Sequence, residues 1–169
     1  MESLNNIGYL FATILLPLFA YKIAQKTEIK SLLKSSISII FCIAVSVIVC
    51  MYSYKVELMQ LLYSTSNVQY SADVFSYLLL NFFPVAILYV TGTLLTANQD
   101  FKLMIYTLAI AVILNITLNF YLIKEFGAKG AGQATLITQL FMLVCYTIYS
   151  IKIFKLSVKI KYVLQLASF

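Results

Sequence analysis

The sequence predicts an all-α integral membrane protein with about five transmembrane helices, and two observations support this prediction. Of the 169 residues, 62% are apolar and only 11% are charged, whereas about half of a soluble domain is apolar and about a quarter is charged. Apolar runs of spanning length also recur along the chain, because about 20 residues of helix cross the hydrocarbon core of a bilayer. This composition excludes a soluble globular domain, a disordered chain and a disulfide scaffold.

Five such runs follow one another in order. They cover residues 3–21, 35–54, 73–97, 103–123 and 130–151. Their central parts carry no charged side chain, which would cost about 2.5–3.5 kcal/mol at the centre of a spanning helix. The first run is too long for a signal-peptide core and lacks a basic leading segment, so we interpret it as a span. We expect a transmembrane bundle over 1–155 and a short basic tail over 156–169.

The lysines predict the orientation of this bundle. Nine lie on one side of the expected spans and three on the other, and cytoplasmic segments carry the basic excess. We therefore expect an external amino terminus and a cytoplasmic carboxyl terminus. The nine are Lys22, Lys26, Lys30, Lys34, Lys102, Lys152, Lys155, Lys159 and Lys161, and the three are Lys55, Lys124 and Lys129.

Two amphipathic stretches are expected to lie along the membrane surface. Residues 23–33 carry a lysine at every fourth position with isoleucine and leucine between them, which is typical of an interfacial helix. Residues 56–63 form a second amphipathic run on the opposite face of the membrane.

The residues that could support catalysis are few. The chain has no histidine, and its six acidic residues all fall in loops or at the ends of the expected spans. They form no pair of carboxylates, metal cluster or nucleophile with a base beside it. We therefore expect no enzymatic activity, no cofactor and no metal site. The three cysteines lie inside apolar runs, where we interpret them as small apolar side chains.

Amide side chains inside the expected spans are more informative. Asn115 and Asn119 lie four residues apart and so share one face of a helix. Asn81 lies in the third run and Gln139 in the fifth. Amides in a bilayer need partners, so these side chains should face other helices or a wet cavity. One interpretation is hydrogen bonding between helices. The other is a polar cavity wall for a sugar-bearing substrate, with these four residues as candidates.

Helix breakers and small residues add candidates for movement and packing. Pro17 lies late in the first run and Pro84 near the middle of the third, with Gly92 two turns later. A proline inside a helix frees a backbone carbonyl and kinks the helix, so these three are candidate flex points. Gly130 and Ala134 lie four residues apart, a spacing of small residues that favours close helix packing.

A motif in the carboxyl-terminal half resembles a known family. Residues 113–139 read ILNITLNFYLIKEFGAKGAGQATLITQ, similar to a hallmark of the prokaryotic polysaccharide and O-antigen flippases. In that family a late core helix reads roughly N-x-x-L-N and is followed by L-I-P-x-x-G-x-x-G-A-A-x-A-T. Here Lys124 replaces the frequent proline and Gly132 a frequent alanine. The likeness covers about residues 5–155.

The resemblance implies the multidrug/oligosaccharidyl-lipid/polysaccharide exporter superfamily. Its fold has two six-helix bundles around a central cavity, and this chain would supply most of the second bundle as the carboxyl-terminal part of a twelve-helix exporter. The amino-terminal bundle would then be a missing partner. The implied activity moves a polyprenyl-diphosphate-linked oligosaccharide (an O-antigen, capsule or exopolysaccharide unit) across the cytoplasmic membrane of a bacterium or archaeon by alternating access. The lipid bilayer is the expected surrounding, and no nucleic acid partner is expected.

Two alternative functions stay open at this point. One is part of a cation-coupled multidrug or toxin exporter, whose mechanism usually needs an acidic residue at membrane depth. The other is a non-transporting remnant or scaffold.

Overall fold

The structure is a computed structural model that describes residues 2–62 and 67–154, with side chains from residue 9 onward. The described residues are helical and contain no strand, which confirms the predicted all-α fold. The helices are α1 (Glu2–Ala24), α2 (Lys30–Ser53), α3 (Lys55–Leu62), α4 (Val68–Ala97), α5 (Phe101–Phe126) and α6 (Ala128–Phe154). The expected tail over 156–169 lies outside the described residues.

The long helices coincide with the apolar runs. By length and composition α2, α4, α5 and α6 can each cross a membrane, whereas α1 contributes a shorter apolar stretch, Tyr9–Ala24. Each of the five expected runs falls on one of these helices. That α1 also spans the membrane stays a prediction.

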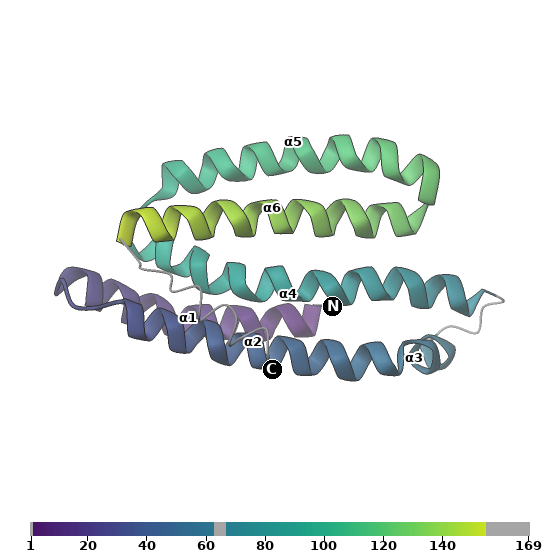
Figure 1. Ribbon diagram of the computed structural model, residues 1–169, viewed down its shortest axis with the longest axis horizontal. Coiled ribbons are helices and arrows are strands. Elements are labelled where there is room, and N and C mark those ends of the chain that lie inside the picture. Colours follow the sequence, from purple (N-terminus) through teal and green to yellow (C-terminus); the bar gives the residue numbers. More distant parts are fainter. Residues whose placement is uncertain (1, 63–66, 155–169) are drawn as a thin grey trace.

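Helix α4 is the central element of the bundle. One of its sides packs on α1 and α2 and another on α6, while α5 contacts the rest of the bundle mainly through α6 (Figure 1). Phe82, Ala86, Val90 and Leu94 recur every four residues of α4, so they share one face of the helix. This face is buried against a core that includes Phe19 of α1 and residues of α2.

The connections gather at the two ends of the bundle. Helix α3, the beginning of α4 and the α5–α6 turn lie at one end, here called the α3 end (Figure 1). The α1–α2 turn, the α4–α5 loop and the last turn of α6 lie at the other, here called the loop end. Lys55, Lys124 and Lys129 belong to the α3 end, separate from the described lysines of the larger group, Lys22, Lys26, Lys30, Lys34, Lys102 and Lys152. Which end faces the cytoplasm stays a prediction.

The prediction of one surface helix over 23–33 is wrong. Helix α1 ends at Ala24 and α2 begins at Lys30, with a turn between them. Lys26 has a φ of 53°, its N–H donates to the Ile23 carbonyl, and the N–H of Thr27 donates to the Lys22 carbonyl. This pair of bonds is a Schellman motif, which ends a helix with one residue in the left-handed region.

The second amphipathic stretch does form a helix of its own. Helix α3 lies across the direction of the long helices (Figure 1). Its Met59 is buried, whereas Leu61 and Leu62 are exposed. Its placement along a membrane surface stays a prediction.

Candidate functional site

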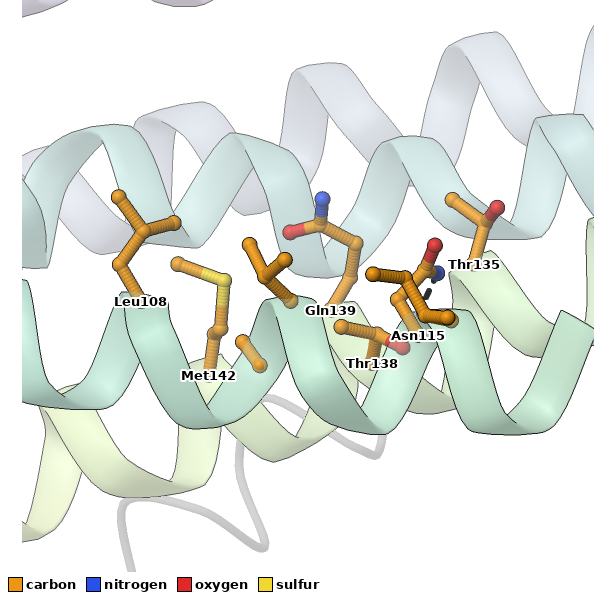
Figure 2. A pocket seen from close by; sticks show the side chains of 9 residues that line it. Leu108, Asn115, Thr135, Thr138, Gln139 and Met142 are labelled. Carbon is orange, nitrogen blue, oxygen red and sulfur yellow. Dashed lines mark hydrogen bonds between the residues drawn. The ribbon is translucent and has the colours of Figure 1, made fainter.

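A groove of about 300 Å³ lies between α5 and α6 (Figure 2). Its lining residues recur every three or four positions along each helix, because such positions share one face. Leu108, Val112 and Ile116 form an exposed apolar rim. The lining residues are Leu108, Ala111, Val112, Asn115, Ile116, Thr135, Thr138, Gln139 and Met142.

A chain of hydrogen bonds joins the two helices at this groove. The side-chain amide of Asn119 donates to Asn115 Oδ1 at 2.9 Å. Asn115 Nδ2 in turn donates to Thr138 Oγ1 at 3.2 Å, the bond dashed in Figure 2. The Thr138 hydroxyl then donates to the Ala134 carbonyl at 2.8 Å. Asn115 therefore both links α5 to α6 and lines the groove, so it fits the two interpretations drawn from the sequence.

Gln139 contributes a side-chain amide to the groove that has no hydrogen-bond partner among the described residues. It lines the groove beside Thr138. The nearby Thr135 hydroxyl donates to the Ala131 carbonyl of its own helix at 2.9 Å. A glutamine amide offers two donors and a carbonyl acceptor, so Gln139 can both donate to and accept from a ligand hydroxyl.

The structure brings together some of the predicted cavity residues and not others. Asn115 and Gln139 line the same groove, and Asn119 is bonded to Asn115 one turn along α5 without lining the groove itself. Asn81 lies on α4, outside the groove, and its buried Oδ1 has no hydrogen-bond partner among the described residues. A role in substrate contact stays a prediction for all four.

The flex and packing candidates occupy different surroundings. Pro84 is buried within α4, which continues unbroken through it, and Pro17 is exposed on α1. A Cβ atom on Gly92 would lie 3.6 Å from the Tyr146 ring. Gly130 approaches the backbone of α5 at Leu122, and Ala134 is fully buried.

Two groups of residues were not predicted as parts of a site. Thr138 is the link between α5 and α6, and its available signal was its position among the polar residues of the fifth run, which are expected to face other helices or a wet cavity. An ionic cluster at the α3 end joins Asp73 to Lys55 and Lys129. Within residues 2–62 and 67–154, no group of histidine, cysteine and acidic residues could hold a metal ion.

Comparison with known proteins gives one family. No curated protein and no solved structure shows a significant match to the chain. The family described as lipid II flippase MurJ matches residues 4–169, nearly the whole chain. This match confirms a multi-pass membrane protein of a flippase family for lipid-linked precursors, but it does not confirm the narrower O-antigen, capsule or exopolysaccharide family. The chain belongs to the lipid II flippase MurJ family, within the exporter superfamily that its motif indicated.

Proposed function

We propose that the chain forms part of the membrane domain of a flippase that moves lipid II, a polyprenyl-diphosphate-linked saccharide, across the cytoplasmic membrane. The family match over residues 4–169 carries this proposal. The movement would proceed by alternating access and without covalent chemistry. A second helix bundle would complete the path around the substrate.

The α5–α6 groove is the proposed contact with the polar part of the substrate. Asn115 lies in the middle of α5 and Gln139 near the middle of α6, at the depth where a bilayer offers polar groups no partner. Their amides can exchange hydrogen bonds with sugar hydroxyls, while the apolar rim faces lipid or a neighbouring bundle. The lining residues include no carboxylate, which favours this function over a cation-coupled drug exporter.

A reconstitution experiment tests the substrate. The protein, in its native form and with any native partner chain, is placed in liposomes that contain a fluorescently labelled lipid. The rate at which external dithionite quenches the fluorescence of lipids from the inner leaflet then reports transport. We expect faster transport for labelled lipid II than for an equally labelled polyprenyl-diphosphate O-antigen unit or phospholipid. Equal rates for lipid II and phospholipid, or a preference for the O-antigen unit, would contradict the proposal.

Replacing Gln139 by leucine is expected to slow lipid II transport about 3- to 10-fold while leaving the thermal unfolding midpoint unchanged. One hydrogen bond contributes about 0.5–1.5 kcal/mol, and about 1.4 kcal/mol is a factor of ten in rate. Stability should not change because no described residue bonds to this amide.

Gln133→Leu is the matched control for this variant. Gln133 lies on the same helix, but its amide donates to the Tyr77 hydroxyl at 3.0 Å, and it does not line the groove. We expect Gln133→Leu to lower the thermal unfolding midpoint, because the bond to Tyr77 is lost, and to leave the substrate preference unchanged. An unaltered transport rate for Gln139→Leu would rule out this glutamine as a substrate contact.

A further inference from the structure

One carboxylate joins three helices at the α3 end. Asp73, near the beginning of α4, accepts from Lys129 Nζ of α6 at 2.7 Å and lies 3.9 Å from Lys55 Nζ of α3. Lys55 Nζ also donates to the Ser76 hydroxyl at 3.1 Å. The side chains of Lys55, Lys129 and Asp73 are only 20%, 30% and 34% exposed, so they are held more firmly than a fully solvated ion pair.

Tyr70 adds a second connection at the same end. Its hydroxyl donates to the Phe126 carbonyl at 3.3 Å and accepts from the Ala128 N–H at 3.0 Å. These two bonds bracket Gly127, whose φ of 60° forms the α5–α6 turn. The Lys129 ammonium also lies 5.0 Å from the centre of the Tyr70 ring. We call Lys55, Tyr70, Asp73 and Lys129 together the α3-end latch.

Among the described residues, the ion pairs and side-chain hydrogen bonds between α4 and α6 lie at this end or one turn beyond it. One turn further on, Gln133 bonds to Tyr77. Beyond that pair, no hydrogen bond between side chains of α4 and α6 occurs among the described residues. The hydroxyls of Thr91 and Thr93 donate to carbonyls of their own helix, and the buried Ser150 hydroxyl has no described partner.

Helices α5 and α6 are connected more closely to each other than α5 is to α4. The Asn115–Thr138 bond joins them at mid-length, and Gly130 packs against the α5 backbone near their turn. At the loop end, the short segment 98–100 connects α4 to α5 along the chain, and Gln99 there has a φ of 61°. The Thr96 hydroxyl of α4 also lies 3.7 Å from Met104 Sδ of α5. The α5–α6 pair is therefore attached to α4 by the packing of α6 along α4, by a short covalent connection at one end and by the polar contacts of the latch at the other.

We propose that the latch is a releasable gate, and that its opening lets the α5–α6 pair swing about the α4–α5 loop and separate from α4 at the α3 end. Apart from the latch, the Gln133–Tyr77 hydrogen bond would also have to break. The remainder of the α4–α6 interface among the described residues consists of small side chains, apolar contacts and hydroxyls that make no hydrogen bond across it. The lysine distribution would make this the external gate. The inference concerns movement and does not depend on which lipid is carried.

Distances between spin labels at the two ends test this gate in the reconstituted protein. Cys42, Cys50 and Cys145 are first replaced by serine. Cysteines for labelling are then introduced at exposed positions, either at Gln60 and Glu125 for the α3 end or at Gln25 and Lys152 for the loop end. With the latch intact, we expect a narrow distance distribution at the α3 end.

Breaking the latch should change only one of the two distances. In Asp73→Asn or Lys129→Gln, we expect the α3-end distance to lengthen by on the order of 5 Å, the scale of a one-turn helix shift, and its distribution to broaden. The loop-end distribution should stay as it was. The double variant should open no further than either single one, because the two groups act as one unit. Tyr70→Phe should give partial opening, and it tests the latch without removing a charge.

Lys124→Gln is the matched control, because it removes a lysine at the same end. The Lys124 ammonium lies 3.9 Å from the centre of the Phe120 ring and forms no ion pair with a described residue. For Lys124→Gln we expect the same narrow α3-end distance distribution as in the protein with the intact latch. The proposal would be overturned by an unchanged α3-end distance in Asp73→Asn, by equal broadening at both ends, or by the same opening in Lys124→Gln.

Discussion

Gly130→Ala is expected to lower the free energy of unfolding by about 1–3 kcal/mol, the usual cost of overpacking a closely packed interface. A Cβ atom at this position would collide with the carbonyl of Leu122 and lie 2.9 Å from the backbone nitrogen of Ile123. These are backbone atoms of α5, so no side-chain rotation can make room. Helices α5 and α6 would have to separate beside their turn.

Thermal or denaturant unfolding in a mild detergent measures this loss, and Gly92→Ala is the matched control. A Cβ atom on Gly92 would meet the Tyr146 ring at 3.6 Å, an ordinary van der Waals contact. Because alanine is a better helix former than glycine, we expect this variant to keep its stability or to gain up to about 1 kcal/mol. Equal losses in the two variants would mean that close approach at Gly130 does not limit the packing of α5 on α6.

The features of the fold that depend on local sequence were predictable. Apolar runs of spanning length give long helices whatever their neighbours are, and spacing alone places Asn115 and Asn119 on one face. The partner of Asn115 was not predictable, because Thr138 meets it only in the register that the turn at Gly127 sets. The Asp73–Lys129 pair depends on packing in the same way, since its members lie 56 residues apart.

The error over 23–33 has a different physical origin. The lysine spacing there is compatible with one helix, and the usual sign of a helix end, a glycine in the left-handed region, is absent. Lys26 adopts that conformation instead, which is uncommon for a residue with a side chain. Asn81 also shows a limit of pattern reasoning, because its position in an apolar run does not say whether α4 contributes to the groove, and no residue of α4 lines it.

Asn115→Leu is the second variant with a large expected effect. Leucine has the branched shape of asparagine without its hydrogen-bonding groups. The change removes the bond to Thr138 and leaves the Asn119 amide without its acceptor. We expect the free energy of unfolding to fall by about 1–2 kcal/mol, because a partly buried donor then lacks a partner and one interhelical bond is lost.

A double variant separates the lost bond from the stranded amide. In Asn115→Leu/Asn119→Leu both partners are apolar, so no donor is stranded and the double variant should be more stable than Asn115→Leu alone. Thr117→Val is the matched control on α5, because this exposed hydroxyl bonds only to the Ile113 carbonyl of its own helix. It should change stability by less than about 0.5 kcal/mol. If the double variant is less stable than the single one, the Asn119 amide does not depend on Asn115.

Lipid II transport by the same double variant decides between the two interpretations of these amides. If they only hold α5 against α6, transport should recover together with stability. If they also contact the substrate, transport should stay low although the helix pair is restored, because leucine cannot exchange hydrogen bonds with a sugar. We expect the second result, since Asn115 lines the groove as well as bridging the helices. Recovery of transport along with stability would assign both amides to helix association and leave Gln139 as the groove's only amide available to a substrate among the described residues.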